Sequence, residues 1–99
     1  MTLTTDMTTD GDRTSVLLEG ELDMASATAV VEAVTEALDQ GAQAIVLDLR
    51  DLTFMDSSGL RVFFDLRARA EQAGATLTAS GARGMVRRAL DATGVALDS

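Results

Sequence analysis

A short apolar run at residues 44–49, AIVLDL, stands between two segments whose apolar residues recur at helical spacing. The run predicts a buried strand, and the helix before it predicts parallel pairing with the preceding strand, because parallel strands need a crossover connection. Strands that alternate with helices in this way form an α/β layer with a mostly parallel sheet. With 99 residues the chain has room for one core, so we expect a single domain over residues 1–99.

The other elements follow from the same periodicities. Residues 2–9 alternate weakly and predict an edge strand, and the turn sequence DGDR leads into a half-buried antiparallel strand, TSVLLEGEL. Helical spacing and glycine stops predict three helices, and apolar alternation predicts two more strands. The expected helices cover residues 26–41, 57–73 and 82–94, and the strands cover 75–79 and 95–99. The predicted order is β-β-α-β-α-β-α-β, a mixed, mostly parallel sheet with an antiparallel N-terminal edge strand.

The apolar positions of the second helix predict the face that it buries. The helix at 57–73 is expected to bury Leu60, Phe63, Phe64 and Ala70. In the segment 82–94, the apolar residues Met85, Val86, Ala89 and Leu90 predict the third helix.

Charge and composition narrow the class of partner. The net charge is −8, from 16 acidic residues against 8 basic ones, all of them arginine. An acidic surface disfavours nucleic acid and anionic membranes and favours a protein partner. No apolar run approaches the roughly 18 residues of a membrane span, and the N-terminus lacks the pattern of a signal peptide, so the expected location is the cytoplasm.

The chain contains no histidine, cysteine or lysine. It therefore lacks the usual general base near neutral pH, a thiolate nucleophile or metal ligand, and a lysine for a Schiff base or a phosphate loop. We expect no enzymatic activity, no cofactor and no metal site.

Two polar corners follow the second and third predicted strands, GELDMAS at residues 20–26 and FMDSSGL at residues 54–60. If these strands are parallel neighbours, both corners open on the same edge of the sheet, and Asp23 and Asp56 flank the serines. The simplest interpretation is structural. Asp56 then caps a helix by accepting from the amides of Ser57, Ser58 or Gly59, and either Ser26 or Asp23 caps the helix before it.

The same geometry permits phosphorylation. A serine in the first turn of a helix is exposed, and the helix N-terminus tolerates a phosphate, which adds about −1.5 to −2 charges. Gly59 is expected to keep one side of Ser58 clear for a kinase. The spacing alone does not choose between Ser57 and Ser58.

Two catalytic interpretations fit poorly. A serine hydrolase lacks a base in this chain. A phospho-aspartate receiver would use Asp48, Asp51 and Asp56 as a magnesium pocket, but the lysine that receivers carry at a later strand end is missing. Asp48 otherwise fills a polar position in the middle of its strand.

Three segments together resemble one family. LDLRDLTFMDSSGL is similar to the signature of STAS domains, specifically bacterial anti-sigma factor antagonists. LLEGELDMASA resembles their earlier motif, and AGATLTASGARGMVRRALDATGV resembles their last strand and helix. The resemblance covers nearly the whole chain in the same order.

The resemblance implies a cytoplasmic partner switch that regulates transcription in stress response or sporulation. The unphosphorylated protein would bind an anti-sigma factor that is also a serine kinase, and so free the sigma factor. That kinase would phosphorylate Ser58, and a serine phosphatase would reset the switch. Asp23 and Ser26 would contact the partner or weakly bind nucleotide. The alternative is a STAS module that does not switch and serves as a scaffold or a transporter-regulatory domain.

Overall fold

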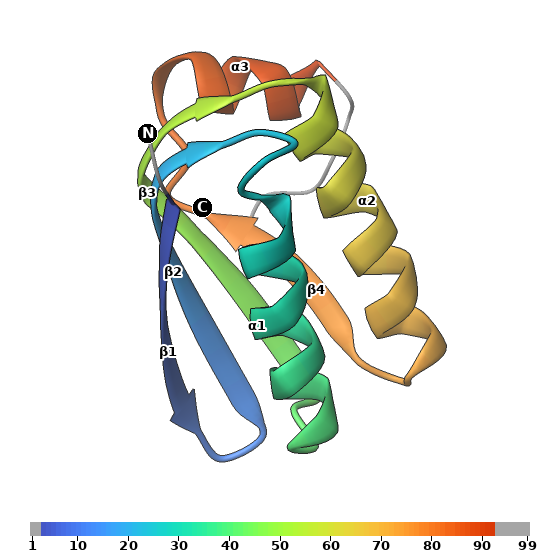
Figure 1. Ribbon diagram of the computed structural model, residues 1–99. Helices are drawn as coiled ribbons and strands as arrows, with labels where there is room; N and C mark the ends of the chain where they lie inside the picture. The colour runs from blue at the N-terminus through green and yellow to red at the C-terminus, as the bar shows by residue number, and fades with distance from the viewer. Residues whose placement is uncertain (1–2, 93–99) are drawn as a thin grey trace.

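A computed structural model describes residues 3–92 of the chain (Figure 1). Its elements in chain order are β1 (Leu3–Asp10), β2 (Arg13–Leu22), α1 (Ala27–Asp39), β3 (Ala44–Met55), α2 (Ser57–Gln72), β4 (Thr76–Ser80) and α3 (Gly84–Asp91). The expected strand at residues 95–99 and the expected helix end at Gly94 lie outside the described residues.

The four strands form one sheet in the order β1-β2-β3-β4. β1 pairs with β2 antiparallel, whereas β2 with β3 and β3 with β4 are parallel. Figure 1 shows α1 and α2 side by side over one face of the sheet, with α3 across the end where β3 leads into α2. The predicted α/β fold, with an antiparallel N-terminal edge strand and three helices, is confirmed.

β3 is longer than predicted. The apolar pattern at residues 44–49 ends at Arg50, but the strand continues to Met55 because it stays paired with β2 up to the register Leu22↔Met55. Two register shifts along this pairing interrupt the simple alternation of buried and exposed residues. The second half of β3 therefore carries no clean strand pattern in the sequence.

The core lies between the sheet and the helices. Buried side chains from all three helices and from β2, β3 and β4 meet there; the largest are Phe63, Leu18, Leu22, Ile45, Leu47, Leu49, Leu66 and Leu90. Among the described helices, none is long and apolar enough to span a bilayer.

Phe64 was predicted to be buried but is 37% exposed, and Leu60 of the same predicted face is only partly buried. In α3, Met85 is 41% exposed. Phe64 and Met85 each stand next to a buried residue, Phe63 or Val86, and the rotation of about 100° between neighbours on a helix places them at the margin of the buried face. Phe64 instead packs edge-on against Phe63, with the ring centroids 5.9 Å apart.

Candidate functional site

The two polar corners meet at one edge of the sheet, as expected from parallel neighbours. The amide of Asp56 donates to the carbonyl of Leu22 over 3.4 Å, which joins the end of β3 to the end of β2. The hydroxyl of Thr53 donates to the carbonyl of Gly20 over 3.0 Å. These bonds hold the start of α2 beside the loop that leads into α1.

Asp56 caps α2. Its backbone is extended, and its Oδ1 accepts a hydrogen bond from the amide of Gly59 at 3.0 Å. Its carbonyl accepts the first bond of the helix, from the amide of Leu60 at 3.1 Å. The predicted cap is confirmed, and it fixes the direction in which the first turn, Ser57 to Leu60, leaves the sheet.

Gly59 has a packing role that sequence reasoning missed. It is buried, and a Cβ built there would lie 2.9 Å from Cγ of Met55 and 3.0 Å from the carbonyl oxygen of Leu22. The missing side chain lets the first turn of α2 rest directly on the end of β2. The expectation that Gly59 clears space beside Ser58 is therefore wrong, because a side chain there would point inward.

The two serines differ in exposure. Ser57 is exposed, whereas Ser58 is only half-buried rather than open to solvent as expected for the first turn. Neither hydroxyl has a hydrogen-bond partner among the described residues. Both oxygens are therefore free for chemistry, and the geometry favours neither one outright.

The corner between β2 and α1 is closed by its own side chains. Oδ1 of Asp23 accepts from the amide of Ser26, and Oγ of Ser26 accepts from the amide of Asp23, each at 3.0 Å. The hydroxyl of Ser26 also lies 2.8 Å from the carbonyl oxygen of Glu21 and 3.0 Å from Oδ1 of Asp23, and its one proton can be donated to either acceptor. Ser26 occupies the N-cap position of α1, and its carbonyl accepts from the amide of Ala29, but its side chain makes no capping bond to the helix because it is engaged with Asp23.

The hydrogen bonds from Ser26 stabilise the ionised form of Asp23. Donation from the amide and then the hydroxyl of Ser26 lowers the pKa of the Asp23 carboxyl below its ordinary value. A negative charge therefore stands beside the start of α2 at neutral pH.

Met24 is a further candidate that the sequence reasoning did not single out. It lies at the tip of the same loop with 77% of its surface exposed, more than any other large apolar residue of the described chain. An apolar residue between Asp23 and Ser26 in an otherwise polar corner was the available signal.

Two of the three aspartates of the receiver alternative are engaged in other interactions. Asp48 pairs with Arg50, with Oδ2 at 3.3 Å from Nε, and its Oδ1 accepts from the Arg50 amide at 3.1 Å. Asp56 caps α2. With Asp48 and Asp56 engaged in this way, Asp51 lacks the two further carboxylates that a magnesium pocket would require.

Comparisons with known proteins agree with this geometry. The family model of the STAS domain matches residues 4–98. An anti-sigma factor antagonist from Mycobacterium paratuberculosis superposes with a TM-score of 0.80 at 27% identity, over 93% of this chain and 78% of that one. The anti-sigma factor antagonist SpoIIAA in its unphosphorylated form gives a TM-score of 0.76 at 25% identity, over 93% and 80% of the two chains.

The fold also occurs within a larger chain. The protein Mglu matches with a TM-score of 0.68 at 27% identity over 75% of this chain, but the match spans only 18% of Mglu. Because the family model covers nearly all of the sequence, the chain belongs to the STAS domain family.

Proposed function

We propose that this protein is an anti-sigma factor antagonist in a phosphorylation-controlled partner switch. Its unphosphorylated form binds an anti-sigma factor that is also a serine kinase, which then releases a sigma factor. Phosphorylation of Ser58 blocks this binding, and a serine phosphatase restores it. In support, two structurally similar proteins are named anti-sigma factor antagonists, and SpoIIAA is described specifically in an unphosphorylated form.

The proposal rests on the free serine hydroxyls at the start of α2, which the surrounding structure holds rigidly. The cap from Asp56 to Gly59 and the close packing of Gly59 on Leu22 fix the first turn of α2. The hydroxyls of Ser57 and Ser58 take no part in these bonds, so a phosphate can be added without breaking them. Ser26 differs, because its hydroxyl is already engaged within its own loop.

Added charge at this position acts on binding more than on the fold. The helix N-terminus favours an anion by roughly 0.3–1 kcal/mol, while repulsion between exposed charges in water is about 1 kcal/mol and is screened by salt. These two effects nearly cancel in the free protein. A docked partner removes the screening water, so the phosphate is then held near Asp56 and Asp23 at greater cost.

The surface around the serines supplies apolar contact for a partner. Ser57, Arg61 and Phe64 are exposed and follow one another at helical spacing on α2. Met24 projects from the neighbouring loop. A partner that covers the serines therefore meets two exposed apolar side chains, which provide binding energy that does not depend on phosphorylation.

The protein itself is proposed to carry out no catalysis and to need no cofactor. Its polar corners are occupied by caps and loop bonds, and no histidine, cysteine or lysine is present to activate a nucleophile. Purified protein should hydrolyse neither ATP nor GTP above background. Turnover that Asp23→Ala abolishes would disprove this part of the proposal.

The direct test is to map the phosphorylated residue. The intact protein is incubated with its cognate kinase and ATP, and the product is analysed by mass spectrometry. A single phosphate on Ser58 is expected, and it should persist in Ser57→Ala and vanish in Ser58→Ala. Modification of Ser57 or Thr53 instead would overturn the assignment of Ser58, and absence of any modification would favour the scaffold or transporter-regulatory alternative.

A further inference from the structure

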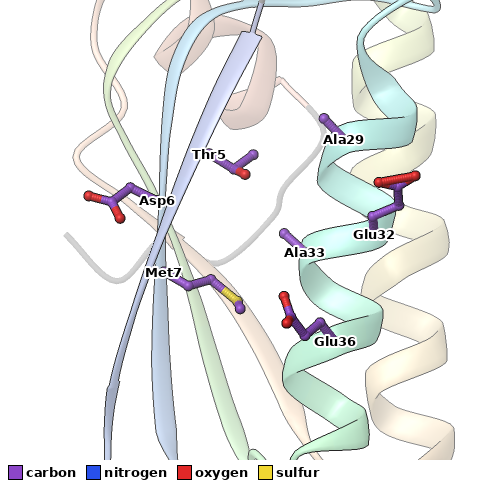
Figure 2. Close-up of a pocket in the computed structure, with 7 residues that line it drawn as sticks. All are labelled: Thr5, Asp6, Met7, Ala29, Glu32, Ala33 and Glu36. Carbon is purple, nitrogen blue, oxygen red and sulfur yellow. The ribbon is translucent and has the colours of Figure 1, made fainter.

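A groove of about 300 Å³ lies between the edge strand β1 and the helix α1 (Figure 2). Its lining residues are Thr5, Asp6, Met7, Ala29, Glu32, Ala33 and Glu36. Figure 2 shows Thr5 and Met7 on the side of β1 that faces α1, with Asp6 on the other side of the strand. The groove is on the β1 side of α1, whereas α2, which begins at Ser57, lies on the other side of α1 (Figure 1). It is therefore separate from the site of the proposed switch.

One wall of the groove is formed by β1, a strand at the open edge of the sheet. β1 is the first strand of the sheet and pairs only with β2 within residues 3–92. Alternate residues of an edge strand point their N–H and C=O groups outward, where an extended segment can pair with them. In this fold α1 packs against β1 and β2, and the groove opens between β1 and the helix, so the side chains of a strand added to β1 that face the helix would point toward the groove.

The groove carries unbalanced negative charge. Of the first 49 residues ten are acidic and one is basic, and neither β1 nor α1 contains a base. No arginine of the described chain forms an ion pair with Asp6, Glu32 or Glu36. A cationic occupant is therefore favoured, and pairing of β1 with β1 of a second copy is disfavoured because it would bring these acidic groups together.

The spacing of the two carboxylates on α1 matches the spacing of alternate side chains along an extended chain. Glu32 and Glu36 are one helical turn apart, about 6 Å. Side chains on one face of a strand recur about every 6.6–6.8 Å, so alternate basic residues can reach both carboxylates. Ala29 and Ala33, which line the same groove, are small, and Met7 offers an apolar contact for the aliphatic stem of an arginine or lysine.

We propose that this groove binds an extended, basic segment of a protein partner. The segment adds to the outer edge of β1 as a further strand, and its alternate arginine or lysine side chains pair with Glu32 and Glu36. Backbone pairing provides the direction and register, and the two carboxylates select basic sequences over neutral ones.

The first experiment uses a capped eight-residue peptide of alternating threonine and arginine as the probe. Titrated into the isotopically labelled full chain, it should shift amide resonances of residues 3–10 and 27–39. Glu32→Gln/Glu36→Gln should weaken binding by about twofold to thirtyfold, as two exposed ion pairs are lost. The matched control Asp39→Asn/Asp65→Asn removes the same charge outside the groove and should change affinity by less than about twofold.

A second experiment tests strand addition itself. Amides of alternate residues point to the same edge of a strand, so N-methylation of the arginine residues and of the threonine residues blocks opposite edges. One methylated peptide should lose binding and the other should retain it. Ser58→Asp should bind the parent peptide as tightly as the unmodified protein, which separates this site from the proposed switch.

Several results would overturn the proposal. Equal weakening by the groove and control variants would indicate general charge attraction. Equal effects of the two methylated peptides would exclude strand addition. A dimer seen by sedimentation without peptide, and lost in the groove variant, would show that the occupant is a second copy of this chain.

Discussion

The two corners at the end of the sheet use an aspartate and serines in different ways. Between β2 and α1, Asp23 and Ser26 bind each other's amides, and the Ser26 hydroxyl also lies against the carbonyl of Glu21. Between β3 and α2, Asp56 binds the amide of Gly59, and both serine hydroxyls are left without an internal partner in the described chain. At the first corner the serine hydroxyl forms hydrogen bonds that hold the loop, whereas at the second corner both serine hydroxyls stay available.

In our proposal, this difference decides which corner is modified and which one holds a partner. Phosphorylation of Ser26 would break bonds that shape its loop, whereas phosphorylation at the start of α2 would break none of those described. The closed loop instead presents Met24 and the ionised Asp23 in fixed positions. In our proposal, one corner is therefore the switch and the other is a permanent part of the docking surface.

The largest expected effect is on partner affinity at position 58. Ser58→Ala should bind the anti-sigma factor constitutively, and Ser58→Asp should bind it more weakly by about 2–5 kcal/mol, or roughly 30-fold to several thousandfold. The reason is that docking desolvates the added charge beside Asp56 and Asp23. Isothermal titration of both variants against the same partner measures the difference. Equal affinities would contradict the switch and leave the scaffold alternative.

Gly59→Ala should have the largest effect on stability. The new methyl group would meet the Leu22 carbonyl and Met55 at about 3 Å, and overpacking of this kind costs about 1–3 kcal/mol. Better helix propensity offsets up to about 1 kcal/mol of that cost. Urea unfolding should therefore show a net loss of about 1–2 kcal/mol, against less than about 0.5 kcal/mol for the exposed control Ser57→Ala. Unchanged stability would show that β2 and α2 move apart easily.

Sequence patterns predicted the fold because segments with helical spacing of apolar residues alternate along the chain with segments that have a strand pattern. They also predicted that the corners meet, since the carboxyl ends of parallel neighbouring strands lie at one sheet edge. They did not predict the exposure of Phe64, because adjacent apolar residues both fit a broad stripe until the axis of the helix is placed against the sheet. The mutual bonds of Asp23 and Ser26 were missed for a similar reason, since either residue alone fits a helix cap.

The groove beside β1 also could not be predicted from the sequence. Its walls come from β1 and α1, which are separated by all of β2, and no periodicity indicates how far α1 extends over the edge of the sheet. Only the excess of acidic residues in the first half of the chain was visible, and that excess does not locate a groove.

Loss of the cap at the second corner should have a smaller effect than overpacking. Asp56→Ala removes the acceptor for the Gly59 amide, and loss of an N-cap costs about 0.5–2 kcal/mol, typically about 1. Asp56→Asn should be nearly neutral, because asparagine caps a helix about as well. For a domain of this size the alanine variant should melt about 4–8 °C lower. An equal loss in Asp56→Asn would mean that the charge matters and not the hydrogen bond.

The smallest effect concerns the charge at the first corner. Because the pKa of Asp23 is lowered in the folded protein, its ionised form stabilises the fold at pH values above its ordinary pKa. That stabilisation is lost as the pH falls below about 4 and through the folded pKa. Carbon-detected NMR titration should show a midpoint for Asp23 below the ordinary aspartate value. Ser26→Ala should raise that midpoint only in part, because the amide of residue 26, the largest cause of the shift, still donates. A full return to the ordinary value would show that the hydroxyl of Ser26, and not the loop backbone, maintains the charge at this corner.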